Sequence, residues 1–105
     1  PYVSEGKLRL VREWFDPLDR SGFDPIPVRE AGGKLWMLDG NARAAAACLA
    51  GWSAVPVYWA DRPVEEAEAE WCDEEGVHSP FDLTDHIVPH LDYERLRWKR
   101  RMKQN

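Results

Sequence analysis

A chain of 105 residues suits a single domain that spans residues 1–105. Hydrophobic residues make up 44% and charged residues 31%, a balance typical of soluble globular domains, and no apolar run approaches the roughly 20 residues of a membrane span. The formal net charge of −5 argues against broad nonspecific affinity for nucleic acids or anionic membranes, although a local basic patch stays compatible with it.

The first predicted element is a helix over residues 4–15. Ser4 can accept a hydrogen bond as its N-cap, and Asp16 followed by Pro17 ends it. Residues 19–25 are rich in polar residues, glycine and proline, which predicts a loop. Apolar residues recur in the helix at helical spacing and form one broad face: Leu8, Leu10, Val11, Trp14 and Phe15.

A β-hairpin is predicted next. Residues 26–29 and 34–38 have strand composition, and Gly32 and Gly33 supply the turn between them. Pro27 lacks an N–H group, which limits the first strand to a sheet edge or to a strand start.

An alanine-rich helix and a third strand complete the first 60 residues. Residues 44–50 favour a helix that Gly51 ends, and residues 55–59 favour a strand. The strands are therefore expected in the first part of the chain.

The last 45 residues are predicted to be helical. Asp61 and Pro63 have the residue types of an N-cap and a first helical turn, so we expect a helix from there to about residue 75, with Gly76 as its end. Ser79 and Asp82 have the spacing of a capping box for a short helix. A last helix, with Asp92 as its predicted cap, includes Tyr93, Leu96 and Trp98.

Strands early and helices late define the predicted fold class, α+β, a small mixed α/β domain with a helical C-terminal portion. No repeat or low-complexity linker divides the chain.

The strand–turn–helix junction at residues 39–43 is the strongest candidate for a functional site. A helix start leaves backbone N–H groups without partners and carries a partial positive charge, which suits a phosphate. Gly40 lets a ligand approach the backbone, Asn41 adds a neutral donor, and Arg43 offers a planar fork for phosphate oxygens. The predicted phosphate- or nucleotide-binding residues are Asp39, Gly40, Asn41, Arg43 and Ala44.

A purely structural interpretation of the same turn is equally compatible with these residue types. Asp39 can be the N-cap, with its carboxylate accepting the N–H groups assigned above to phosphate. Arg43 would then pair with an acid such as Asp39, or lie in solvent.

Residues 25–59 contain an ordered series of short motifs. The segments are Pro25-Ile-Pro-Val28, Leu38-Asp-Gly-Asn-Ala-Arg43-Ala, Leu49-Ala-Gly51 and Val55-Pro-Val-Tyr-Trp59. They correspond to a P-I-x-V strand, G-x-x-R at a helix start after a hairpin, an alanine-rich helix ending in A-G, and a V-P-V strand. This order and spacing resemble the ParB/sulfiredoxin-like superfamily.

Further pieces resemble a branch of uncharacterised bacterial ParB-like proteins and extend the likeness over nearly the whole chain. These pieces are SEGKL and WF within residues 4–15, EWCDEEGV at residues 70–77, DL at residues 82–83, and the helix over residues 93–101.

The resemblance implies a nucleotide or phosphate pocket at the turn, held by Gly40 and Arg43, because members of the superfamily include CTP-binding partition proteins, a sulfinic-acid reductase and a free-serine kinase. At the position of Asn41, the resemblance implies a reactive cysteine in sulfiredoxins, a glutamate in partition proteins and usually a histidine in the closer branch. Asparagine is neither a nucleophile nor a general base at neutral pH. Ala42 likewise replaces a threonine of the closer branch.

Three functions follow from this reasoning. The first is a binding or regulatory module for a nucleotide or another phosphate-bearing small molecule, without efficient turnover, with a nucleotide and Mg²⁺ as the cofactor that the resemblance would imply. The second is a phosphotransferase or NTPase with Asp39 as its nearest candidate base. The third is an accessory domain of DNA-acting machinery, although nucleic-acid contact by this domain alone is not expected.

The remaining polar groups are expected to be structural. His86 and His90 have a metal-compatible spacing, but Pro89 disfavours a regular helix between them, so we expect no metal site. His78 is expected in a loop. Eight acids over residues 61–75 and six basic residues over 95–103 are expected to be solvated helix faces, with Ala67, Trp71 and Cys72 on the apolar side of the acidic helix.

The two cysteines, Cys48 and Cys72, have no metal-binding or redox spacing. We expect reduced, buried thiols, and hence a cytoplasmic protein, since no signal-peptide pattern is present.

Overall fold

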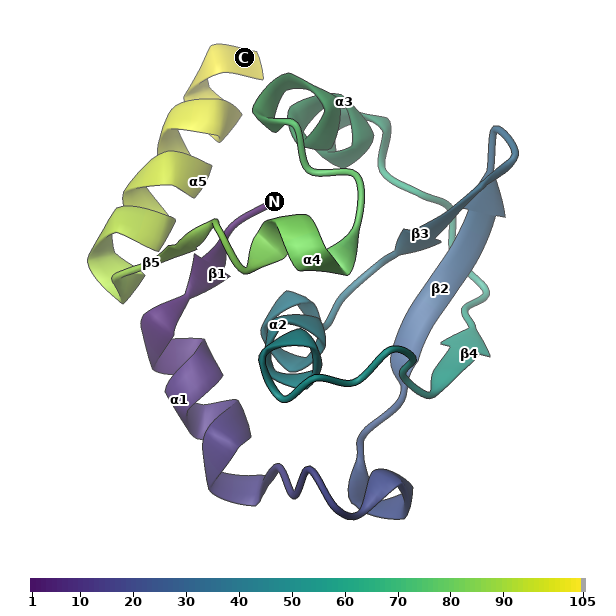
Figure 1. Ribbon diagram of the computed structural model, residues 1–105. Helices are drawn as coiled ribbons and strands as arrows, with labels where there is room; N and C mark the ends of the chain where they lie inside the picture. Colours follow the sequence, from purple (N-terminus) through teal and green to yellow (C-terminus); the bar gives the residue numbers. More distant parts are fainter. Residues whose placement is uncertain (105) are drawn as a thin grey trace.

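The computed structural model describes residues 1–104 and is a small mixed α/β fold with five α-helices and two small sheets (Figure 1). The helices are α1 (Glu5–Trp14), α2 (Asn41–Leu49), α3 (Glu66–Glu75), α4 (Pro80–Leu83) and α5 (His90–Gln104). The larger sheet has the strand order β3-β2-β4 and contains β2 (Ile26–Ala31), β3 (Lys34–Met37) and β4 (Val57–Trp59). The smaller sheet pairs β1 (Val3–Ser4) with β5 (Ile87–Val88).

The predicted hairpin is confirmed as β2 and β3. Gly32 and Gly33 have φ angles of 59° and 76°, and two consecutive positive φ angles are what a tight hairpin turn requires. Strand β2 pairs antiparallel with β3 and parallel with β4, so it is the central strand of its sheet.

Pro27 is tolerated in this central strand because it lies at the strand start. Its carbonyl accepts a hydrogen bond from Leu38 N at 2.9 Å. In this register an N–H group at position 27 would donate to the Leu38 carbonyl, but proline has none. The Leu38 carbonyl instead accepts a hydrogen bond from Arg62 Nη2 at 3.1 Å. Of the two positions expected for this proline, a sheet edge or a strand start, the structure shows the strand start, since Pro27 is the second residue of the central strand β2.

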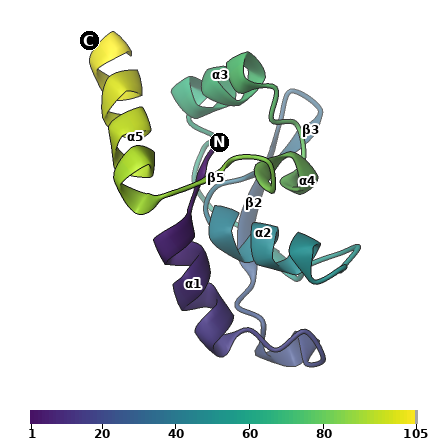
Figure 2. The same cartoon turned by 60° about the vertical axis from the view of Figure 1, so that its left-hand side comes forward.

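Helix α2 occupies the centre of the molecule, between the larger sheet and the layer formed by α1, α4 and β1 (Figures 1 and 2). Its four consecutive alanines at 44–47 are all buried, which lets neighbouring elements approach closely. They pack in one apolar core with Leu8 and Val11 of α1 and with Ile26 and Val28 of β2. Gly51, with a φ of 84°, follows the helix, as predicted.

Helix α1 begins as predicted, because the Oγ atom of Ser4 accepts a hydrogen bond from Lys7 N at 3.3 Å. Leu8 and Val11 are buried. The predicted apolar face is too broad, however, since the side chains of Leu10 and Trp14 are exposed.

Helix α3 begins later than the sequence suggested. Residues 61–65 are not helical, and the N-cap is Glu65 rather than Asp61. Arg62 precedes a proline, which disfavours helical backbone, and its guanidinium is held by the Leu38 carbonyl. Gly76 ends the helix in left-handed backbone with a φ of 71°, as predicted.

The capping box of α4 is confirmed. The carboxylate of Asp82 accepts hydrogen bonds from His78 N at 2.8 Å and Ser79 N at 3.1 Å, and these bonds hold the pKa of Asp82 below its usual value. Helix α5 begins at His90, so Asp92 lies in its first turn and is not its cap. The preceding Pro89 carbonyl accepts the first helical bond, from Tyr93 N at 2.9 Å.

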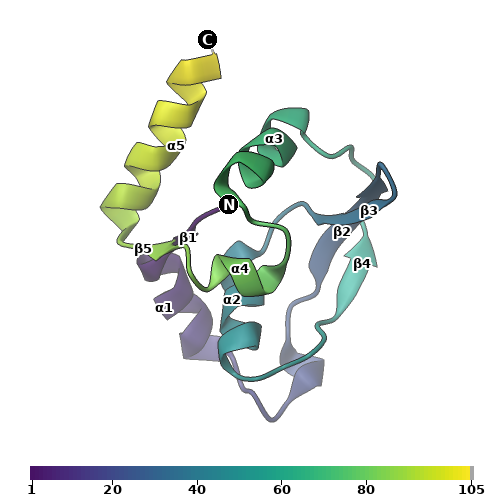
Figure 3. The same ribbon diagram turned by 45° about the horizontal axis from the view of Figure 1, so that its top comes forward.

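The pair of β1 and β5, which joins the N-terminal segment to the residues just before α5, is not predicted by the sequence. Val3 lies opposite Ile87 and Ser4 opposite Val88 in a parallel register. The N-terminal segment consequently lies between α3 and α5 (Figures 1 and 3). No helix within residues 1–104 combines the length and the apolar character needed to cross a membrane.

Candidate functional site

The turn between β3 and α2 has the predicted strand–turn–helix geometry. Gly40 is the N-cap of α2 and adopts left-handed backbone, with a φ of 88° and a ψ of 25°. Asn41 is the first residue of the helix, and Asp39, Gly40, Asn41, Ala42 and Arg43 all line the same open cleft. The turn is therefore accessible to a ligand.

Asp39 does not cap the helix. Its Oδ1 atom accepts a hydrogen bond from Gly40 N at 2.8 Å, outside the helix. No side chain of residues 1–104 caps α2, and the first amide that bonds within the helix is Ala44 N, to Gly40 O at 2.9 Å. The amides of the first turn thus retain their capacity to donate to a ligand.

Arg43 is held more firmly than either sequence interpretation expected. Its Nη1 atom donates to the carbonyls of Asp24 and Pro25, both at 2.9 Å, and lies 3.1 Å from Asp24 Oδ2. Its side chain is only 14% exposed. The expectation that Arg43 pairs with an acid is therefore confirmed, although the acid is Asp24 and not Asp39, and Arg43 does not lie in solvent. These contacts fasten the segment before β2 to the start of α2.

Two features favour glycine at position 40: the left-handed backbone there and the close approach of the Arg43 side chain. A Cβ atom at Gly40 would lie 3.0 Å from Arg43 Nη2 and 3.2 Å from Arg43 Nε, so the guanidinium lies directly against the glycine. Within the described chain neither Nε nor Nη2 takes part in a hydrogen bond. Nη1 of the guanidinium is thus hydrogen-bonded to the protein, whereas the edge formed by Nε and Nη2 lies against the turn without a hydrogen bond among the described residues.

Ala44 does not belong to the accessible site. Its side chain is 1% exposed, and its amide is already bonded to Gly40 O. It packs beneath the turn in the core, so the predicted site shortens to residues 39–43.

The cleft in front of the turn has a volume of about 650 Å³, large enough for a nucleotide-sized molecule. Its walls include three basic side chains that the sequence analysis did not connect with the turn: Lys7 of α1, Arg62 before α3, and Arg97 of α5. Asp24, Asp39, Glu65 and Glu68 add carboxylates to the same walls. The long-range packing of α1 and α5 brings these groups together, and no local spacing reveals it.

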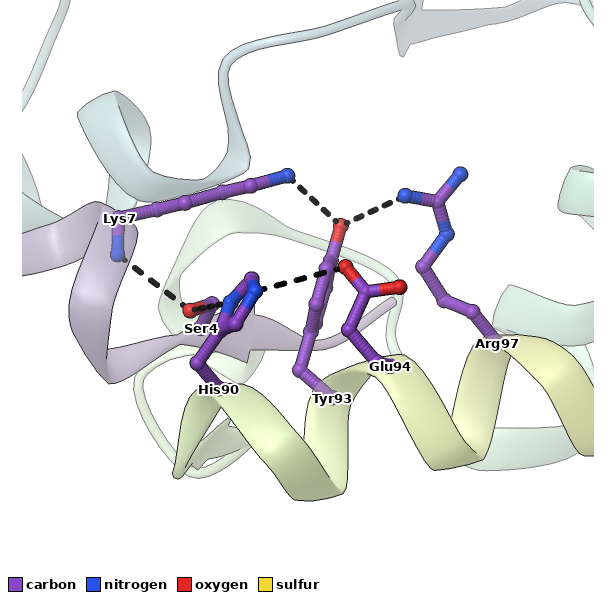
Figure 4. A network of polar contacts seen from close by, with 6 residues as sticks. All are labelled: Ser4, Lys7, His90, Tyr93, Glu94 and Arg97. Atoms are coloured by element: carbon purple, nitrogen blue, oxygen red, sulfur yellow. Dashed lines mark hydrogen bonds and ion pairs between the residues drawn. The ribbon is translucent and has the colours of Figure 1, made fainter.

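A polar network fixes the start of α1 against the start of α5 (Figure 4). Ser4 Oγ lies 2.8 Å from His90 Nδ1, and His90 Nε2 lies 3.6 Å from Glu94 Oε1. Serine, histidine and acid are the residue types of a hydrolase triad, but here the serine contacts Nδ1 and the acid lies beside Nε2, the reverse of the triad arrangement. In addition, Ser4 is 1% exposed and is occupied as the N-cap of α1, so this network positions helices and does not present a nucleophile.

The structure also places the remaining polar groups. His86 lies between α4 and β5, outside any helix or strand, whereas His90 begins α5, so the two histidines do not share a helix. Residues 1–104 contain no group of three metal-ligating side chains. His78 is exposed in a loop, and Trp71 is buried beneath the acidic helix.

The basic segment is not uniformly solvated. Arg97 lines the cleft, and Arg100 forms an ion pair with Glu74 of α3. Cys48 and Cys72 are free but only partly buried, and burial raises the pKa of both thiols, which lowers their reactivity.

Comparison with models of known protein families found no match, and comparisons with curated proteins and with solved structures found none either.

Proposed function

We propose that the cleft binds a nucleotide or another phosphate-bearing small molecule, with a phosphate group at the start of α2. The observation that carries this proposal is the uncapped helix start at Gly40, which opens into a cleft of about 650 Å³. Bare amides and the positive end of the helix dipole attract an anion without any side-chain charge.

The motif order supports a fold of ParB/sulfiredoxin-like type for this site. The P-I-x-V segment forms β2, the G-x-x-R segment starts α2, and the V-P-V segment leads into β4, which pairs with β2. In this proposal Asn41 gives a binding or regulatory module rather than an efficient catalyst, because an amide side chain does not transfer protons at neutral pH.

The first test changes the charge at the helix start while keeping its shape. Asn41→Asp replaces an amide by a carboxylate of the same size at the first position of α2. The added charge should stabilise the free protein by about 0.3–1 kcal/mol through the helix dipole, and should weaken ATP or CTP binding about tenfold or more by repulsion. Calorimetric titration measures the affinity and urea unfolding measures the stability.

Ser53→Asp is the matched control, because it adds the same charge at an exposed loop position that does not line the cleft. Its nucleotide affinity should equal that of the unaltered protein. If Asn41→Asp also binds ATP and CTP with unaltered affinity, phosphate does not bind at the start of α2.

The competing function, phosphoryl transfer or nucleotide hydrolysis, has one specific observation in its favour. Asp39 is an exposed carboxylate on the cleft wall, next to the proposed phosphate position. We expect little or no release of phosphate from ATP or CTP in the presence of Mg²⁺. Robust hydrolysis that Asp39→Asn abolishes and Glu65→Gln preserves would replace the binding module by an enzyme.

A further inference from the structure

We infer that the cleft contains a second anion-binding subsite, formed by Lys7, Tyr93 and Arg97, and that its ligand therefore carries two separate anionic groups. This inference rests on the proposed function, because it assigns the second group of a ligand whose first phosphate lies at the start of α2. The three side chains come from α1 and α5, on segments far apart in the sequence.

The two cations converge on one oxygen atom (Figure 4). Lys7 Nζ lies 3.5 Å and Arg97 Nη1 3.4 Å from Tyr93 Oη. The Lys7 ammonium also lies 4.8 Å from the centre of the tyrosine ring, and the Arg97 guanidinium 5.5 Å from it. Because both nitrogens are this close to the same hydroxyl oxygen, two positive charges lie within about 7 Å of each other.

No carboxylate in the described part of the chain forms an ion pair with Lys7 or Arg97. The nearby acid Glu94 is placed beside His90 instead. Two like charges without a direct ion-pair partner repel each other, and an anion between them would remove that repulsion while gaining charge-assisted hydrogen bonds. Tyr93 Oη accepts from both cations, so its own hydrogen is free to donate to the same anion.

The subsite is built on a fixed frame. The contact of Ser4 Oγ with His90 Nδ1 joins the helix starts of α1 and α5, one turn before Lys7 and Tyr93 respectively. His90 also stacks on Tyr93, with ring centres 6.0 Å apart and an angle of 26° between the rings. Such support reduces the entropy lost when a ligand orders these side chains.

Lys7, Tyr93 and Arg97 line the same cleft as the turn at Gly40. A ligand with a single phosphate satisfies only one of the two places, whereas occupation of both requires a molecule with two separate anionic groups, such as a nucleoside polyphosphate or a bisphosphate. The ammonium and the guanidinium have the donor chemistry that phosphate oxygens require. The cleft is thus suited to a ligand with phosphate groups at two positions.

The test compares ATP affinity, measured by calorimetric titration at several salt concentrations, for two charge-matched double variants. Lys7→Gln with Arg97→Gln removes the subsite. Arg9→Gln with Arg101→Gln removes the same charge from exposed positions on the same two helices, outside the cleft. The subsite variant should lose about tenfold or more in affinity and show a weaker salt dependence, and the control should lose less than about twofold. Lys7→Arg with Arg97→Lys, which retains both charges, should recover most of the loss.

Asn41→Asp, measured in parallel, separates this inference from the proposed function. If Asn41→Asp weakens ATP binding and the subsite variant does not, the second subsite is wrong and the site at α2 stands. If only the subsite variant weakens binding, the anion lies at Lys7, Tyr93 and Arg97, and the phosphate position at α2 is wrong. Equal affinity of all variants, or no ATP binding by the unaltered protein at millimolar concentration, overturns both.

Discussion

Arg43→Ala is expected to lower the free energy of unfolding by about 2–3 kcal/mol, because it removes hydrogen bonds from a charged group to two backbone carbonyls. The guanidinium leaves a shielded position, since the Arg43 side chain is only 14% exposed, whereas Asp24 and Pro25 are exposed, so water can bond to their carbonyls in the variant. Urea unfolding measures the effect. The sequence alone suggested an exposed residue, whose removal would cost only a few tenths of a kcal/mol.

Two variants give this measurement its controls. Arg9→Ala, at an exposed position of α1, should change stability by less than about 0.5 kcal/mol. Asp24→Asn removes the exposed carboxylate beside Arg43 but leaves the backbone carbonyls in place, so it should cost less than about 1 kcal/mol and should strengthen nucleotide binding. If Arg43→Ala is as stable as Arg9→Ala, the guanidinium does not fasten residues 24–25 to α2.

Trp52→Ala is expected to cost about 3–5 kcal/mol of stability, the largest effect of any substitution proposed for this chain. The indole is 7% exposed and packs against Phe15 and Phe23, with ring centres 5.1 and 5.2 Å away. Its Nε1 atom donates to the Pro17 carbonyl at 3.0 Å, and the Arg20 guanidinium lies 4.5 Å above the ring. The Trp52 side chain thus contacts four residues between the end of α1 and the start of β2: Phe15, Pro17, Arg20 and Phe23.

Trp52→Phe keeps an aromatic ring but removes the N–H donor, so it should recover much of the loss and differ from the unaltered protein by about 1–2 kcal/mol. Trp98→Ala, at a position of α5 that is 61% exposed, is the control for a tryptophan outside the core. Equal effects of Trp52→Ala and Trp98→Ala on urea unfolding would contradict the packing of Trp52 against Phe15 and Phe23.

Local chemistry made the central part of the fold predictable. Two glycines with positive φ define the hairpin, and Gly40 and Gly51 mark the limits of α2. These features depend on the backbone preferences of single residues, which a sequence displays directly. The accessible turn at residues 39–43 was predicted for the same reason.

Features that depend on distant segments were not predictable. Strands β1 and β5 have two residues each, too few for any periodic pattern. The partner of Arg43 is Asp24, on a loop before β2, and the cationic wall of the cleft comes from α1 and α5. Residues 61–65 have good helix-start composition, but the contact of Arg62 with the Leu38 carbonyl outweighs that preference.

The junction of β1 with β5 has a consequence for how the cleft is assembled. Ser4 and His90, which meet there, are 86 positions apart, so their contact requires the closure of nearly the longest loop that the chain can form. The entropy of loop closure favours local contacts first, and the hairpin and α2 can form before the ends of the chain meet. We therefore expect the two walls of the cleft to form in sequence: the turn at Gly40 with the early, local contacts, and the wall of Lys7 and Arg97 only when β1 pairs with β5.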